Sequence, residues 1–590
     1  MINTYVAFAE LLAELMNRKR GHLGRVKEIP QKPSFANRHN SSEPMPRSTA
    51  EEEGVSSAWV CSLLRELYEQ DSVHLHHLFI MRHGHVIAEC AVDPYREDTW
   101  HASYSMCKSF ISMAIGILAD EGKLSVYNHV LFYFPEYANV LDILRFRDLT
   151  IRHLLTMSSG STFNEMGAIS GNDWVQGFFS STLKFTPGSK FDYNSMNTFM
   201  LSAIITKITG KSAFEFLKER LFEPMGIRDI FWENSPSGIT KAGWGLFIRP
   251  EDAAKLGQLY LNSGSWYGRQ LISPEWIYAS TEPQIETGKP DNPRYGYQIW
   301  MDHLPGSYMY NGMLGQNVHV YPSLDLVVVT NAGNEEVFAG GTMTGILRKW
   351  ISPEYFSDSP LADDPESGRT LSRLLEEIRG SGKQAVTGVS GGWRRGRNTQ
   401  QHAFFRFLHE IDGAEYELKA KGIGLMPLIM QVIHNNYTRG LDKLRFELRG
   451  DTLVLLLTEG ETVHELPVGF ACGKDTKVIE NGEEYLVGVK GKYAYNEDGK
   501  AVLSLQIAFT EEAAERRLKI IFLSVDKLEL RFSETPGDRV IAGTLELITT
   551  GSGNANPMVS EIMEKLNPET LEGFLEIAVK PVSMAERIKS

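Results

Sequence analysis

The feature that most constrains the fold is a change of hydrophobic pattern about two thirds of the way along the chain. Residues 56–352 combine helically spaced apolar positions with short apolar runs, whereas apolar and polar residues alternate after residue 400. Successive side chains of a strand point to opposite faces, so period-two runs separated by turn residues predict antiparallel strands. We therefore expect an α+β domain followed by a separate β-rich domain, since 590 residues exceed what one core normally holds.

Four regions follow from this change of pattern. Residues 1–55 are expected to form an N-terminal helix and a polar arm, and residues 56–352 the α+β domain. Residues 353–400 are rich in Ser, Pro, Gly and charge around one short amphipathic segment, which predicts a linker. Residues 401–590 form the predicted β-rich domain, whose role the sequence does not indicate.

Composition limits the possible partners. The chain has 60 Lys and Arg against 74 Asp and Glu, a net charge of −14, which argues against nucleic acid and anionic membranes as partners.

Its four cysteines do not have the spacing of a disulfide framework or a zinc site. The N-terminus lacks the charge order of a secretory signal, and the apolar runs are too short to span a membrane. We expect a cytoplasmic protein without metal or cofactor, and the oligomeric state stays open.

The sharpest local signal is a serine three residues before a lysine. Ser105 and Lys108 open an otherwise apolar helix predicted over 105–121, and residues three apart share one helix face. A serine hydroxyl needs a neighbouring base, and a lysine becomes one when burial lowers its pKa. The same spacing recurs at 181–184 and 524–527, so the spacing alone is weak evidence. The apolar helix that follows singles out Ser105 as a candidate nucleophile with Lys108 as its base.

Several segments extend this signal over about half of the chain. They are, in order, LFIMRHGHVIAE, SMCKSF, LADEGKL, LTIRHLLTMSSG, FTPGSKFDYNSMN, GLFIRPEDAAKLGQLY, YGYQIW and YNGMLGQNVHVYP. In this order they resemble the serine β-lactamase and penicillin-binding-protein superfamily, in the class C-like branch with carboxylesterases and 6-aminohexanoate-dimer hydrolases. The resemblance implies a β-lactamase-like antiparallel sheet flanked by helices, a helical subdomain, and the serine at their junction. It also implies a cofactor-free serine acyl hydrolase that acts on a small ester or amide.

The second motif of that family falls on Tyr193, Asn194 and Ser195. The resemblance implies that the Tyr193 phenol lies near Lys108, is partly phenolate and shuttles protons. Ser195 stands where many members have Asn, and we expect it to contact substrate. Without the resemblance, Tyr193 would be read as a half-buried aromatic residue in a turn.

The third motif departs from the family pattern. β-Lactamases have Lys-Thr-Gly on the edge strand, but this chain has Tyr310, Asn311 and Gly312. The missing cation argues against β-lactam turnover and favours an ester or amide without a substrate carboxylate. The resemblance still implies an oxyanion hole from the N–H groups of Ser105 and Met313, with Asn311 and Gly312 at the substrate. The plain alternative for 310–317 is a glycine-containing turn.

Two histidine motifs suggest other chemistry. The sequence Arg82-His83-Gly84 is similar to a motif of histidine phosphatases, but the apolar runs on either side favour a hairpin turn at Gly84. His74 and His76 alternate as paired metal ligands do, yet no partner residue has the spacing to complete a site. We expect a strand that begins with surface histidines.

Two functions stay open at this point. The first is a serine acyl hydrolase that forms an acyl-enzyme on Ser105. The second is a binding or scaffold protein that has kept the fold and lost turnover, a possibility raised by the altered third motif and the unexplained β-rich domain. Convergence of the Ser105, Lys108 and Tyr193 side chains would favour the first.

Overall fold

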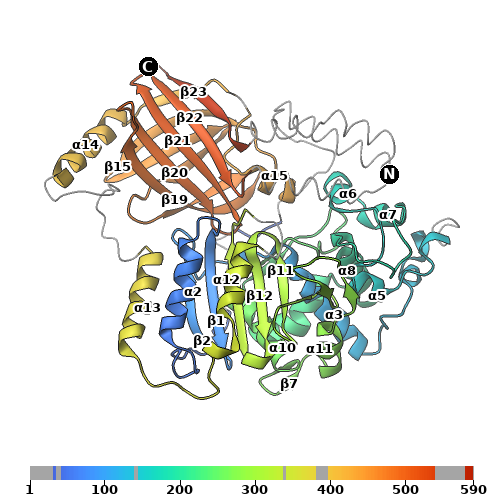
Figure 1. The fold of residues 1–590 in the computed structure, drawn as a ribbon. Coiled ribbons are helices and arrows are strands. Elements are labelled where there is room, and N and C mark those ends of the chain that lie inside the picture. Colours follow the sequence, from blue (N-terminus) through green and yellow to red (C-terminus); the bar gives the residue numbers. More distant parts are fainter. Residues whose placement is uncertain are drawn as a thin grey trace.

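A computed structural model of the chain describes residues 31–34, 42–137, 144–335, 341–380, 396–420, 422–537 and 579–588. Figure 1 shows a first domain of helices around a sheet, and above it a C-terminal domain dominated by one large sheet. We use these two names for residues 42–380 and 396–588. The helix predicted within residues 1–19 lies outside the described residues.

An eight-stranded antiparallel sheet forms the centre of the first domain, in the order β2-β1-β13-β12-β11-β10-β9-β8. The strands are β1 (Leu75–Arg82), β2 (His85–Ala91), β8 (Ile285–Glu286), β9 (Arg294–Tyr295), β10 (Trp300–Met301), β11 (Tyr308–Gly312), β12 (Gln316–Tyr321) and β13 (Leu326–Ala332). The apolar run LVVVTNA forms β13, and every residue of this strand is buried. The expected antiparallel sheet flanked by helices is therefore confirmed.

Helices cover both faces of this sheet, which explains why β13 reads as a continuous apolar run. Val327 and Val329 pack in the cluster with α3 (Lys108–Asp120) and α10 (Pro250–Leu261). Leu326 and Val328 pack on the other face. That face is covered by α2 (Ser57–Glu69), α12 (Thr342–Trp350) and α13 (Pro365–Ile378). Helix α13 comes from the segment expected as a linker and packs against α2.

Helix α3 joins the sheet to a helical subdomain. The subdomain contains α5 (Ile151–Leu155), α6 (Glu165–Ser170), α7 (Trp174–Phe179), α8 (Ser195–Thr209) and α9 (Ala213–Leu217). Its apolar side chains share one core cluster with α3, which is buried from Lys108 to Leu118. The helix predicted over 105–121 begins as a 3-10 turn, η2 (Tyr104–Cys107). At its other end, Gly122 has φ +67°, the left-handed conformation typical of a glycine that ends a helix.

The two histidine motifs lie at either end of β1. The predicted hairpin is confirmed, because His83 and Gly84 turn the chain with positive φ between β1 and β2. The Arg82 guanidinium is buried and donates to the Leu324 and Glu53 carbonyls. The expectation of surface histidines is wrong for His76 and His77. Both are buried, and His76 lies beside Gly333, which approaches the Ala513 carbonyl of the C-terminal domain.

The C-terminal domain is a ten-stranded antiparallel sheet in the order β17-β16-β15-β14-β23-β22-β21-β20-β19-β18. Its strands are β14 (Glu415–Leu418), β15 (Leu441–Arg449), β16 (Thr452–Glu459), β17 (Thr462–Pro467), β18 (Lys474–Glu480), β19 (Glu483–Tyr495), β20 (Ala501–Phe509), β21 (Ala514–Ser524), β22 (Lys527–Thr535) and β23 (Val582–Arg587). The edge strands β17 and β18 lie side by side, although no ladder joins them within the described residues. The alternation predicted after residue 400 is confirmed, since the apolar positions within 503–509 and 528–532 form one interior cluster.

The core of the C-terminal domain continues into the first domain. Trp100, Tyr104 and Leu314 of the first domain belong to the same apolar cluster as the interior of the C-terminal sheet. The loop 510–513 between β20 and β21 is buried in this interface, where the Ala102 N–H donates to the Glu511 carbonyl at 2.8 Å. The C-terminal domain thus packs directly on the turn that carries Ser105.

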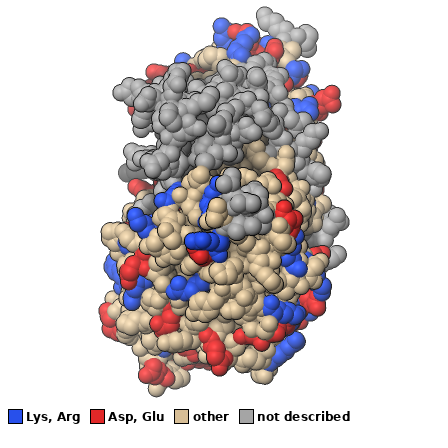
Figure 2. All heavy atoms as spheres, turned by 90° about the vertical axis from the view of Figure 1, so that its right-hand side faces the viewer, with Lys and Arg blue, Asp and Glu red and all other residues tan. Residues whose placement is uncertain are grey.

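Within the described residues, no helix combines the length and apolar character needed to cross a bilayer. On the face in Figure 2, basic and acidic side chains are interspersed over the first domain.

Candidate active site

Ser105 and Lys108 meet as their spacing predicts. Lys108 Nζ lies 2.7 Å from Ser105 Oγ and donates to the Gly243 carbonyl at 2.6 Å. The Lys108 side chain is almost completely buried, and this burial lowers its pKa to about 8. A neutral amine is therefore accessible near neutral pH, in contact with the hydroxyl that it would deprotonate.

Tyr193 completes the cluster from the opposite side. Lys108 Nζ lies 5.2 Å from the centroid of the Tyr193 ring, and the ring stacks on Trp300. Burial raises the pKa of Tyr193 above its ordinary value, and a hydrogen bond with the Ser105 side chain opposes this shift. This direction of shift favours a protonated phenol over the partial phenolate that the resemblance implies, and the role of Tyr193 stays a prediction.

The start of α8 fixes where Tyr193 lies. The Asn194 side chain caps this helix by accepting from the Met196 N–H at 2.9 Å, and its amide donates to the carbonyls of Ser161 and Phe163. Ser195, the first residue of α8, lies against Gly243, where an added Cβ would come within 2.7 Å of the Ser195 Cβ. Ser195 thus adjoins the carbonyl that holds Lys108.

The end of β11 runs beside the turn that carries Ser105. A Cβ on Gly312 would lie 2.4 Å from the Ser103 carbonyl oxygen, so this close approach requires glycine. The Asn311 amide donates to Asn317 Oδ1 of β12 at 2.5 Å. Met313 follows on the neighbouring turn, and its side chain packs against the C-terminal domain.

Two residues that the sequence did not single out shape this cluster. Glu165, at the start of α6, accepts from the Ser195 N–H at 3.0 Å, and its charge acts to raise the pKa of both Lys108 and Tyr193. Lys289 Nζ lies 5.6 Å from the centroid of the Trp300 ring. Neither residue belongs to a helix or strand pattern that contains Ser105, so no periodicity could link them to it.

Cys107, although close to Ser105, is not a competing nucleophile. Its sulfur lies 3.0 Å from the carbonyls of Tyr104 and Ala242, to which it donates. Burial raises the pKa of the Cys107 thiol to about 12. Since the thiolate is the reactive form of cysteine, this side chain is inert near neutral pH.

A buried charge network connects the C-terminal domain to the nucleophile. His434 pairs with Glu512 at 3.0 Å and with Glu233 at 2.8 Å. Burial alone would lower the pKa of His434, but the two carboxylates raise it well above its ordinary value. Glu233 also pairs with Lys241 at 2.9 Å. Lys241 lies two residues before Gly243, so the network ends next to the Lys108 site.

Comparison with known proteins finds relatives of the first domain. A family model described as Beta-lactamase matches residues 64–338. A 6-aminohexanoate-dimer hydrolase of Paenarthrobacter ureafaciens is 25% identical over 280 residues, which cover 42% of this chain and 70% of that protein. The esterase EstB of Burkholderia gladioli is 27% identical over 176 residues, 25% of this chain and 45% of that protein. Among solved structures, a family VIII carboxylesterase matches with 16% identity and a TM-score of 0.43, over 52% of this chain and 98% of that chain.

Proposed function

Residues 64–338 form a domain of the beta-lactamase family, and from this premise we propose that the protein cleaves an ester or amide bond through an acyl-enzyme on Ser105. The relatives named above are a hydrolase and an esterase, which supports a serine hydrolase of the same fold for this chain. The nucleophile, its partners and the substrate class are the parts that we propose. The observation that carries them is the 2.7 Å contact between Lys108 Nζ and Ser105 Oγ in a buried site.

The first step is attack by Ser105. Neutral Lys108 accepts the Ser105 proton along this contact while Ser105 Oγ bonds to the substrate carbonyl carbon. Negative charge then develops on the carbonyl oxygen, towards which the N–H groups of Ser105 and Met313 would donate. Each such donor typically contributes about 3 kcal/mol to the stability of the transition state.

The second step releases the alcohol or amine. The proton held by Lys108 passes to the leaving group, and the neutral phenol of Tyr193, hydrogen-bonded to Ser105, supports its role as the proton relay. Water then attacks the acyl group, gives its proton to the same pair and frees Ser105. This cycle returns every proton and needs no external oxidant or reductant.

The third motif favours neutral esters and amides over β-lactams. Tyr310 stands where the β-lactamase motif has lysine, and its buried hydroxyl donates to the Leu256 carbonyl at 3.5 Å, so it offers no cation to a substrate carboxylate. We therefore expect turnover of short-chain p-nitrophenyl esters to exceed turnover of a chromogenic β-lactam.

Labelling with a fluorophosphonate probe, together with ester hydrolysis, tests the proposal. The wild-type protein should be labelled at Ser105 and should turn over p-nitrophenyl butyrate, whereas Ser105→Ala should lose both. Ser112→Ala is the matched control, because Ser112 is a buried serine on α3 whose hydroxyl has no hydrogen-bond partner within the described structure. Turnover that persists in Ser105→Ala would refute the mechanism. Absence of labelling and turnover in the wild type would favour the binding or scaffold alternative.

A further inference from the structure

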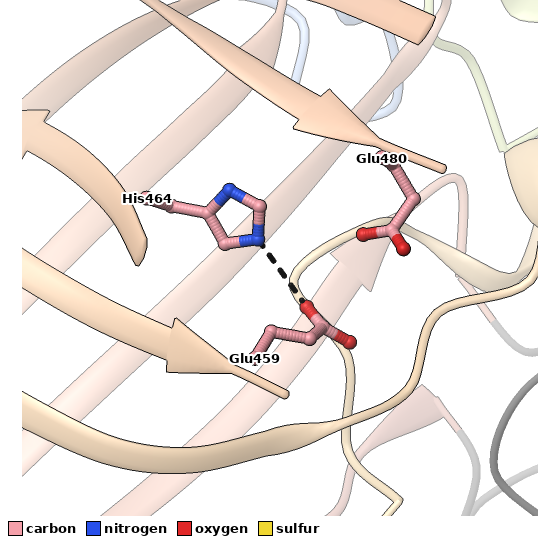
Figure 3. Close-up of side chains that lie close together, drawn as sticks. All are labelled: Glu459, His464 and Glu480. Carbon is pink, nitrogen blue, oxygen red and sulfur yellow. Dashed lines mark ion pairs between the residues drawn. The ribbon is translucent and has the colours of Figure 1, made fainter. Parts of the chain in front are cut away.

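Three buried side chains from separate strands converge near one end of the C-terminal sheet. Glu459 ends β16, His464 lies in β17 and Glu480 ends β18. They are 3%, 2% and 5% exposed, and one ligand atom of each lies within 4.8 Å of the others. Figure 3 shows the imidazole and the two carboxylates pointing toward one another.

Two atoms in this cluster lack the partners that buried polar groups normally have. His464 Nε2 and Glu459 Oε2 are 3.6 Å apart, and neither has a hydrogen-bond partner within the described structure. The other Glu459 oxygen accepts from the Gly440 N–H at 2.5 Å, which fixes the carboxylate. A buried polar atom without a hydrogen-bond partner is energetically unfavourable, so a bound cation would stabilise both atoms.

The cluster also lies across the seam of the C-terminal sheet, which is the line where its edge strands β17 and β18 lie side by side. Glu459 and His464 belong to the β16–β17 edge, and Glu480 belongs to the opposite edge strand, β18. No backbone ladder joins β17 to β18 in the part of the chain described. A ligand held by all three residues would therefore link the two edges of the C-terminal sheet.

The charges around the cluster suit a divalent cation. Arg516, the nearby buried cation, is paired with Glu534 at 2.7 Å, so its charge is already balanced. The Glu459 and Glu480 carboxylates face each other in this buried cluster, and a cation between them would offset their mutual repulsion.

We propose that Glu459, His464 and Glu480 bind one divalent transition-metal ion, with zinc as the preferred ion, which ties the seam of the C-terminal sheet. One imidazole nitrogen and two carboxylate oxygens are zinc ligands, and three protein ligands leave a position for water. Magnesium rarely uses imidazole and retains several waters, so it should bind poorly. The expectation of no metal site rested on Cys and His spacing, which cannot reveal ligands contributed by three strands.

Zinc titration of the full-length, tag-free protein tests this site. All variants carry Cys472→Ser, because the exposed Cys472 thiol is a competing zinc ligand. We expect one equivalent by calorimetry and elemental analysis, and a rise in Tm with zinc but not with magnesium. His464→Gln should weaken zinc binding by about 100-fold or more. Glu465→Gln, which changes the exposed neighbour on the same strand, should bind like the parent.

A second variant keeps the result interpretable if His464→Gln folds poorly. Glu480→Gln removes a carboxylate ligand but keeps the size and polarity of the side chain, so it should fold like the parent without zinc and bind zinc weakly. A cobalt-loaded parent should show no thiolate charge-transfer band, since the proposed ligands are nitrogen and oxygen. Absence of stoichiometric zinc binding, or equal affinity in the parent, His464→Gln and Glu480→Gln, would overturn the proposal.

Discussion

The Tyr104 hydroxyl, one residue before Ser105, donates a hydrogen bond to Glu512 Oε2 of the C-terminal domain at 3.4 Å. Tyr104 has φ +45°, a left-handed conformation that costs a residue with a side chain on the order of 1 kcal/mol. Contacts from outside the turn must therefore hold it in place. Because Glu512 also pairs with His434, the C-terminal domain contributes to the scaffold around the nucleophile.

We expect Tyr104→Phe to impair catalysis without loss of the fold. The substitution removes one buried hydrogen bond, worth about 1 kcal/mol, and should lower kcat for ester hydrolysis about 3- to 10-fold. Tyr95→Phe is the matched control, because the buried Tyr95 hydroxyl has no hydrogen-bond partner within the described structure. Steady-state kinetics of both variants test this role, and an unchanged kcat in Tyr104→Phe would contradict it.

Glu511 should matter chiefly for stability. Its carboxylate accepts from Trp100 Nε1 at 2.5 Å and pairs with Lys32 at 3.1 Å, and both groups of the pair are buried. Glu511→Ala leaves the Lys32 charge buried and unpaired, so we expect a loss of about 3–5 kcal/mol in the free energy of unfolding. Glu529→Ala removes a pair with the exposed Arg531 and should cost less than about 1 kcal/mol. Urea denaturation measures both, and equal losses would rule out the buried pair as the cause.

The parts of the fold that the sequence predicts are those with local patterns. Helix α3 and the β1–β2 hairpin follow from runs of apolar residues and a terminal glycine or turn. The Ser105–Lys108 contact follows because its two residues are one helical turn apart. These features depend on neighbours in the chain, so one sequence is sufficient to expect them.

The rest of the site depends on contacts between distant segments. Glu512 and Tyr104 are 408 positions apart, and His434 and Glu233 are 201 apart. Taken one at a time in the sequence, these residues would be interpreted as solvated charged residues or as the end of a strand. Only the docking of the C-terminal domain buries them together. The burial of His76 was missed for the same reason, since Gly333 beside it approaches the loop near residue 513 of the C-terminal domain.

Gly312→Ala should damage the site more than its size suggests. The new methyl group would come within 2.4 Å of the Ser103 carbonyl, which can only be relieved by moving β11 or the turn before Ser105. We expect a loss of about 1–3 kcal/mol in stability and about 100-fold in kcat, because the Met313 N–H follows directly. Gly345→Ala, on α12 with no atom within 4 Å of the added Cβ, should be neutral or stabilising. Equal kinetics in the two variants would contradict the close-approach argument.

Lys289 should affect substrate choice, given the proposed function. It is half-buried near Trp300, which itself stacks on Tyr193, so its cation adjoins the aromatic side of the cluster. We expect Lys289→Met to raise KM about 5-fold for an ester that carries a free carboxylate, and to leave a neutral ester unaffected. Lys190→Met, at an exposed lysine before Tyr193, is the control. A parallel change for both esters would exclude charge recognition.

The pH dependence of acylation should report Lys108. The amine acts as a base only when neutral, so kcat/KM should rise with pH through the pKa of about 8 that burial produces. Tyr193 acts as an acid and its pKa is raised above the ordinary value of 10, so no descending limb is expected below pH 10. The negative charge of Glu165 raises the pKa of Lys108, so Glu165→Gln should move the midpoint to lower pH. Glu275→Gln, a carboxylate at the start of α11 (Pro274–Thr281), should leave the midpoint where it is. A midpoint near 10.5, the ordinary value for lysine, would show that Lys108 is not the base, because a solvated ammonium cannot accept the Ser105 proton near neutral pH.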